Sequence, residues 1–238
     1  MSSSYAELSL VPNRRIDLET GEATPVKKHT KTTNNKARGV LDIPNQGNNY
    51  LARQVCGKVG ETLIKVLLKN HLSKKRVPNY NLFDLVFVDG SFGEVKTGRY
   101  GNRAVIIESQ LQKMPQNGFY CLVYYKIEGF KTATEALVYA KDKGLKSGES
   151  FLKKRVKVKS VFVFPRSDIV YFYNLPTTTK NKIRDNKKGQ PTEYFVGLGV
   201  TGAKKLFLEN PGDFEQTHFS LSEGKIPVYM TGFPDIQL

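Results

Sequence analysis

The chain contains no tryptophan, only two cysteines and three histidines, and fewer acidic than basic residues. Cys56 and Cys121 both stand among apolar residues, which favours buried, reduced thiols over a disulfide framework. Two cysteines and three scattered histidines form no zinc-binding signature. No apolar run approaches the roughly 18–20 residues that cross a bilayer, and the N-terminus lacks the pattern of a secretory signal. These absences predict a soluble, cytoplasmic protein.

Positive charge is what the chain has in excess. Its 238 residues carry 37 Lys and Arg against 22 Asp and Glu, a formal net charge of +15, and 39% of them are hydrophobic. The surplus is concentrated, because residues 151–200 hold eleven Lys and Arg against three acidic residues, and residues 51–100 hold nine against four. Such clustering is typical of a polyanion-binding footprint, and a nucleic acid is a better candidate partner than a membrane surface.

Composition and hydrophobic periodicity divide the chain into three parts. Residues 1–49 are expected to be a basic, partly irregular arm, because they show neither helical nor strand periodicity. Residues 50–145 are expected to be a core of helices and strands. Residues 146–238 are expected to be a β-rich, basic extension packed on the core, which we interpret as a nucleic-acid recognition region.

The elements expected within these parts predict an α/β (α+β) fold, with a mixed β-sheet flanked by helices. A helical stripe runs from about Gln54 to Leu72, and a β-hairpin turns at Asp89-Gly90. The remaining patterns predict a helix over 104–114 ended by Pro115, a strand over 119–125, a helix over 133–143 opened by a capping box, and strands over 156–164, 168–173 and 194–200.

Three charged residues of the hairpin form the most specific pattern of the sequence. Asp84 stands in the first expected strand, and Glu94-Val95-Lys96 stands in the second. Because side chains alternate between the two faces of a strand, Glu94 and Lys96 should project on one side and Val95 on the other. Strand pairing should bring Asp84 close to them. Two carboxylates beside an ammonium can bind a hard divalent cation and place a positive charge beside an attacking water.

This pattern resembles the PD-(D/E)xK nuclease superfamily, which includes restriction endonucleases and Holliday junction resolvases. Asp84, Glu94 and Lys96 match the motif residues, although no proline directly precedes Asp84. Glu61 matches the glutamate that many members carry on the preceding helix, and Gln110 matches a glutamine on the following one. The resemblance implies a restriction endonuclease-like core. It also implies a Mg²⁺ cofactor, replaceable by Mn²⁺, held by Asp84, Glu94 and Glu61.

Each of these residues also has a purely structural interpretation. Asp84 could simply begin a strand, and Glu94 and Lys96 could form a solvated pair. Glu61 could pair with Lys65 one helical turn later, and Gln110 could lie on a helix surface. The convergence of Asp84, Glu94 and Lys96 is the reason to favour a catalytic interpretation of these three.

Basic residues of the extension are the candidate contacts to nucleic acid. Lys157 and Lys159 share one face of an expected strand, so they form a positive stripe suited to a phosphate backbone. A polar, basic loop follows over 177–189. The candidate contacts are Lys157, Lys159, Lys180, Lys182, Arg184, Lys187 and Lys188.

The sequence therefore predicts a Mg²⁺-dependent DNA endonuclease. A homodimeric, sequence-specific restriction-type enzyme acting on double-stranded DNA is the first choice, because the chain adds about a hundred residues to the core that the resemblance covers. A resolvase or other structure-specific nuclease acting on branched DNA is an alternative, as is an antibacterial nuclease toxin attacking DNA or tRNA. A further alternative is a protein that binds nucleic acid without cleaving it.

Overall fold

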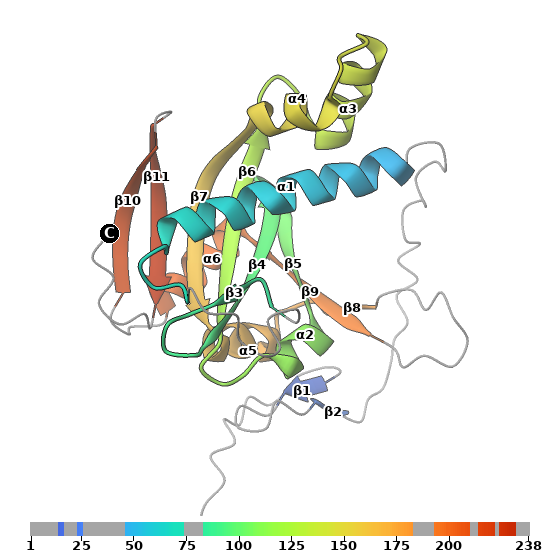
Figure 1. Ribbon diagram of the computed structural model, residues 1–238. Helices are drawn as coiled ribbons and strands as arrows, with labels where there is room; N and C mark the ends of the chain where they lie inside the picture. Colours follow the sequence, from blue (N-terminus) through green and yellow to red (C-terminus); the bar gives the residue numbers. More distant parts are fainter. Residues whose placement is uncertain are drawn as a thin grey trace, which may run out of the picture.

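A computed structural model describes residues 14–16, 23–25, 46–73, 83–182, 193–209, 214–221 and 224–231 (Figure 1). The helices are α1 (Gln46–Leu67), α2 (Glu108–Lys113), α3 (Ala133–Asp142), α4 (Gly148–Arg155), α5 (Arg166–Asn174) and α6 (Val200–Glu209). The strands are β1 (Arg14–Ile16), β2 (Ala23–Pro25), β3 (Leu85–Val86), β4 (Phe92–Arg99), β5 (Arg103–Ile107), β6 (Phe119–Ile127), β7 (Val156–Pro165), β8 (Asn181–Lys182), β9 (Tyr194–Gly199), β10 (Phe214–Leu221) and β11 (Gly224–Thr231).

A six-stranded mixed sheet organises the molecule, with strand order β10-β11-β7-β6-β4-β3. Parallel pairs join β4 to β6 and β7 to β11, and the other neighbouring strands are antiparallel. A smaller antiparallel sheet has the order β5-β9-β8. The prediction of a mixed sheet flanked by helices is confirmed.

Strand β6 shows why both faces of the large sheet must be covered. Its residues from Phe119 to Tyr124 are all buried, so both sets of alternating side chains pack into cores. Phe119, Cys121 and Val123 contact the C-terminal half of α1. Tyr120, Leu122 and Tyr124 belong to a second core, formed with α5, α6, β5 and β9. Burial of each large apolar side chain stabilises the fold by about 1.5–3 kcal/mol.

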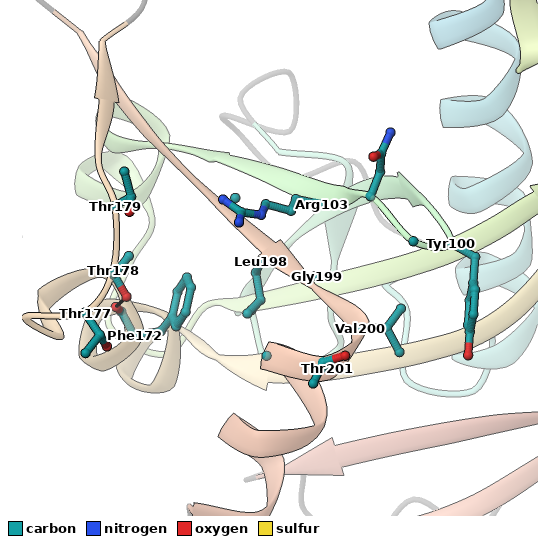
Figure 2. A pocket seen from close by; sticks show the side chains of 14 residues that line it. Tyr100, Arg103, Phe172, Thr177, Thr178, Thr179, Leu198, Gly199, Val200 and Thr201 are labelled. Carbon is teal, nitrogen blue, oxygen red and sulfur yellow. Dashed lines mark hydrogen bonds between the residues drawn. The ribbon is translucent and has the colours of Figure 1, made fainter. Parts of the chain in front are cut away.

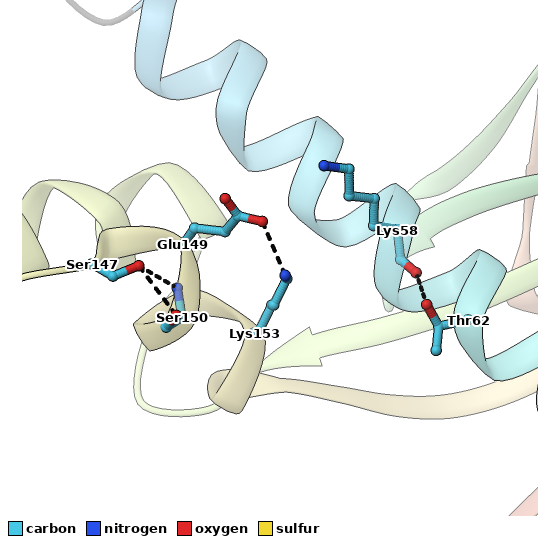
Figure 3. Close-up of polar contacts among 6 residues, drawn as sticks. All are labelled: Lys58, Thr62, Ser147, Glu149, Ser150 and Lys153. Atoms are coloured by element: carbon cyan, nitrogen blue, oxygen red, sulfur yellow. Dashed lines mark hydrogen bonds and ion pairs between the residues drawn. The ribbon is translucent and has the colours of Figure 1, made fainter.

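Helices α3 and α4 pack against the N-terminal half of α1 around a third core. Both begin where the sequence offers a capping side chain. Thr132 Oγ1 accepts a hydrogen bond from Glu135 N at 3.0 Å, as the capping box predicts. Ser147 Oγ accepts from Ser150 N at 3.1 Å at the start of α4 (Figure 3).

The expected hairpin is present, with Leu85 opposite Gly93 and Val86 opposite Phe92. Gly90 takes the positive φ of +84° that its tight turn requires. Asp89 Oδ1 also accepts hydrogen bonds from the backbone and hydroxyl of Ser91, at 2.9 and 2.7 Å. The turn residues therefore set the register that brings Asp84 to β4.

The helix predicted over 104–114 is wrong in its first half. Residues Arg103–Ile107 form β5, and only Glu108–Lys113 are helical. Ala104 and Ile106 are completely buried, while Arg103 and Val105 are exposed, which is the alternation of a strand. The β-branched residues of this segment favour a strand. The segment also pairs with β9 over its whole length, Arg103–Ile107.

The strand predicted over 168–173 is also wrong, because Arg166–Asn174 form α5. Ile169, Val170 and Tyr173 are completely buried and share one helical face, whereas Tyr171 is exposed. Strands β7 and β9 and the expected strand over 119–125 are present, with small shifts of their ends.

The predicted division at residues 50 and 145 stays a prediction, and most of the expected arm lies outside the described residues. Helix α1 begins at Gln46 instead of Gln54 and ends at Leu67. The region after residue 145 contributes β7, β10 and β11 to the same sheet as β4 and β6. It also contains helices α4, α5 and α6, so its described part is not purely β.

Candidate active site

Asp84 lies immediately before β3 and is tied to β4 by a hydrogen bond. Its Oδ2 accepts from the backbone N–H of Val95 at 2.8 Å, between the two other charged residues of the motif. The side chain is half-buried beside the buried Phe83 and Leu85. The pairing of β3 with β4 therefore places this carboxylate next to Glu94 and Lys96, as the sequence predicts.

Glu94 and Lys96 project from the same face of β4 and form an ion pair. Lys96 Nζ lies 2.5 Å from Glu94 Oε1, and only 8% of the Glu94 side chain and 17% of the Lys96 side chain are exposed. Val95 belongs to the core on the opposite face, against α1. The predicted alternation of faces is confirmed, and it turns the charged pair toward the side of the sheet that carries β5 and β9.

The carboxylates of this site hold more negative charge than Lys96 balances. Burial raises the pKa of the Glu94 carboxyl, the Lys96 ammonium opposes that rise, and the charges of Asp84 and Glu61 add to it. Burial and the charge of Asp84 also raise the pKa of Glu61. Additional positive charge at this position would relieve the repulsion among the three carboxylates.

Glu61 lies on α1, which covers the face of the sheet opposite to Glu94 and Lys96, and its link to the cluster is the effect of the Asp84 charge on its pKa. It is half-buried, and its Oε2 lies 4.0 Å from Lys65 Nζ, so the helical pair that the sequence allows is present as a long contact. Within the described part of the chain, no group of three His, Cys, Asp or Glu residues is placed to hold a metal ion. Asp84 and Glu94 supply oxygen donors of the kind that Mg²⁺ prefers.

Gln110 lies in α2, and its Oε1 is buried without a hydrogen-bond partner in the described residues. No hydrogen bond among those residues joins Gln110 to Asp84, Glu94 or Lys96. A buried amide oxygen without a partner costs free energy, while the residue as a whole is half-buried. Its catalytic role stays a prediction.

Sequence reasoning did not identify Tyr120, which lies beside Glu94, or Arg166, whose charge acts on Tyr120. Tyr120 pairs with Glu94 in the parallel register of β4 and β6, and its hydroxyl is buried without a hydrogen-bond partner in the described residues. Burial and then the charge of Glu94 raise the Tyr120 pKa, which the buried Arg166 opposes. Arg166 Nε donates to Leu111 O at 3.2 Å. Pairing the expected strand over 119–125 with the second strand of the hairpin would have predicted that Tyr120 lies beside Glu94.

The candidate nucleic-acid contacts fall on two separate elements. Lys157 and Lys159 lie on β7 of the large sheet, where Lys126 of β6 pairs with Lys157. Lys180 and Lys182 lie at β8, on the edge of the small sheet, and Lys180 Nζ stands 4.6 Å from the centre of the Tyr173 ring. The other three candidates, Arg184, Lys187 and Lys188, are outside the described residues.

Comparisons with known proteins give no information about the function of this site. No protein-family model, curated protein or solved structure matches this chain. Within the described residues, no helix has both the length and the apolar character needed to cross a membrane.

Proposed function

We propose that the chain is a metal-dependent DNA endonuclease that resembles the PD-(D/E)xK superfamily. One observation carries the proposal: Asp84 converges at the start of β4 with Glu94 and Lys96, which follow it in the chain by ten and twelve positions across the hairpin. The fold supports it further, because a helix with Glu61, the hairpin, α2 with Gln110 and the apolar strand β6 follow one another in the order that the resemblance implies.

The residues of the site divide the work of phosphodiester hydrolysis. Asp84 and Glu94 would hold Mg²⁺ or Mn²⁺, assisted by Glu61. The bound cation would polarise a phosphoryl oxygen and lower the pKa of a water molecule. Lys96 would orient that water and offset the charge that develops on the phosphate in the transition state. Its ion pair with the buried Glu94 holds the ammonium in place.

Double-stranded DNA is the proposed substrate, and a restriction-type homodimer is the proposed form. The basic residues of β7 and β8 would hold the phosphate backbone, which fixes register and orientation but reads no sequence. Cleavage of linear duplex DNA, four-way junction DNA and tRNA would separate this substrate from those of the alternative nucleases. A molar-mass measurement in solution would test the homodimer.

Lys96→Ala tests the catalytic assignment. We expect cleavage of duplex DNA with Mg²⁺ to fall by at least about a hundredfold, because a preorganised charge at the reacting phosphate is lost. Binding of the same DNA, measured in EDTA, should stay close to that of the wild type, because this lysine is mostly buried.

The control is Lys205→Ala, which removes a lysine whose ion pair with Glu209 is exposed on α6. It should cleave like the wild type. Full Mg²⁺-dependent cleavage by Lys96→Ala would overturn the assignment of this residue, and cleavage that persists in EDTA would overturn the metal-dependent mechanism.

A nucleic-acid-binding protein without catalysis is the second candidate. It is favoured by the lack of a three-residue metal-binding group in the described part of the chain. Titration calorimetry with Mg²⁺ or Mn²⁺ distinguishes the two candidates. A nuclease should show a cation site that Asp84→Asn and Glu94→Gln both weaken, whereas a simple binder should show none.

A further inference from the structure

A polar cleft of about 460 Å³ lies beside the small sheet, and its lining does not include Asp84, Glu94 or Lys96 (Figure 2). Its walls come from the turn between β4 and β5, the segment after α5, the end of β9 and the first turn of α6. This volume is in the range of small-molecule sites, which span roughly 300–1,000 Å³. No acidic residue lines the cleft, and Arg103 is the charged residue of its lining.

Arg103 is held across the cleft by its packing on β9. It begins β5, where it pairs with Gly199. Its aliphatic chain lies directly over Gly197, since a Cβ added there would come within 2.6 Å of Arg103 Cδ and 2.9 Å of its Cβ. Figure 2 shows the guanidinium directed toward the side of the cleft that carries Thr177–Thr179. Gly197 therefore provides the flat surface on which this side chain rests.

The guanidinium is exposed and has no ion pair or side-chain hydrogen bond within the described residues. Four threonines line the same cleft: Thr177, Thr178 and Thr179 form one wall, where Thr178 Oγ1 donates to Phe172 O at 2.7 Å, and Thr201 stands in the first turn of α6. A guanidinium can donate several parallel hydrogen bonds, so it fits a ligand with several acceptor oxygens, such as a phosphate ester, better than a ligand with a single acceptor atom.

The backbone of the cleft supports the same ligand chemistry. Residues 197–202 read Gly-Leu-Gly-Val-Thr-Gly, a glycine-rich turn from strand β9 into helix α6. The turn is not part of a dinucleotide-binding βαβ unit, because β9 lies between two antiparallel neighbours. The backbone N–H groups of the first turn of α6 nevertheless lie at the cleft wall, where they provide hydrogen-bond donors for an anion in addition to Arg103.

We propose that this cleft binds a phosphate-ester unit of the nucleic acid, a few nucleotides from the bond that is cut. The inference deepens the proposed function and rests on it for the identity of the polyanion. Strand β4 runs from Lys96 to the turn at Tyr100, a span of about 13 Å at strand geometry. Lys96 projects on the face of the sheet that carries β5 and β9. One DNA strand can therefore reach both places.

Arg103→Gln tests the cleft, with binding measured in EDTA so that cleavage plays no part. The probe is a short fluorescein-labelled DNA duplex, followed by anisotropy at several salt concentrations. We expect affinity to fall roughly tenfold, as the loss of a charged hydrogen-bond donor implies. The slope of log affinity against log salt should decrease by about 0.9, one phosphate contact.

Three further variants make the result specific. Arg103→Lys should retain much of the affinity, and Thr201→Val, at an exposed hydroxyl, should weaken binding a few-fold without affecting folding. Lys205→Gln removes an equal charge from the solvent-exposed face of α6 and should change affinity little. Arg103→Gln and Thr201→Val binding as tightly as the wild type would overturn the proposal, as would an equal loss in Lys205→Gln.

Competition identifies where the phosphate comes from. Inorganic phosphate and deoxythymidine 5′-monophosphate are added to the labelled complex of the wild type. Weak displacement supports a backbone phosphate, and strong displacement by the monophosphate identifies a free nucleotide as the source. Arg103-dependent binding by a protein that does not cleave DNA would sustain the cleft and refute the nuclease. If the wild type cleaves DNA and Arg103→Gln binds it as tightly as the wild type, the nuclease is sustained and the cleft is refuted.

Discussion

Glu94 is the residue at which stability and proposed function conflict most. Only 6% of it is exposed, and its ion pair with Lys96 does not cancel the effects of burial and of the neighbouring carboxylates on its pKa. A folded protein keeps such a group only if the group serves another purpose or gains a partner when a ligand binds. Residue types and spacing revealed Asp84, Glu94 and Lys96, because they share one short hairpin.

The raised pKa of Glu94 predicts how its replacement affects stability. The folded carboxyl holds its proton more tightly than the unfolded one, so the stability it contributes is complete below its ordinary pKa of 4.5 and is lost as pH rises through the raised value. Glu94→Gln should therefore raise the melting temperature relative to the wild type at neutral pH. The difference should shrink toward acid pH in thermal unfolding followed by circular dichroism.

Glu149→Gln is the matched control with the opposite sign. The hydrogen bond from Lys153 lowers the Glu149 pKa, so this carboxylate contributes stability above its ordinary value that is lost as pH falls (Figure 3). The variant should melt slightly below the wild type at neutral pH and like it in acid. A decrease of melting temperature in Glu94→Gln at neutral pH would contradict our electrostatic account.

Among the elements, those defined by local chemistry were predicted best. The capping box, the hairpin turn and the apolar run of β6 each depend on neighbouring residues. Segments 104–114 and 168–173 were assigned wrongly because short apolar runs fit a helix and a strand almost equally. Strand β5 forms because β9, about ninety residues later, supplies its hydrogen bonds, and α5 forms because one of its faces meets the core.

Thr132→Ala tests the cap of α3. Its hydroxyl satisfies the backbone N–H of Glu135, so removal should lower the free energy of unfolding by about 1 kcal/mol, measured as a shift of the urea midpoint. Thr132→Ser keeps the acceptor oxygen and should cost only a few tenths of that. Equal losses in both variants would show that the methyl group, not the hydrogen bond, stabilises this end of the helix.

At the scale of the molecule, the chain carries a net charge of +15 together with a small acidic site at the hairpin. Binding of duplex DNA in EDTA should therefore depend steeply on salt. Four phosphate contacts correspond to a loss of affinity of roughly a hundredfold between 50 and 200 mM salt. The double variant Lys157→Gln and Lys159→Gln should reduce the slope of log affinity against log salt by about two. An affinity that does not change with salt would contradict the proposed nucleic-acid surface.

Local chemistry was enough to assign the mixed α/β class, the basic segments and the charged residues of the hairpin, because period, turn residues and charge are all readable along the chain. Only the tertiary structure brought the charge of Arg166 to Tyr120, left Gln110 Oε1 buried without a partner in the described residues, and assembled the Arg103 cleft. These features depend on strand pairing and on burial between segments far apart in sequence. Both are properties of the packed molecule, and no local pattern encodes them.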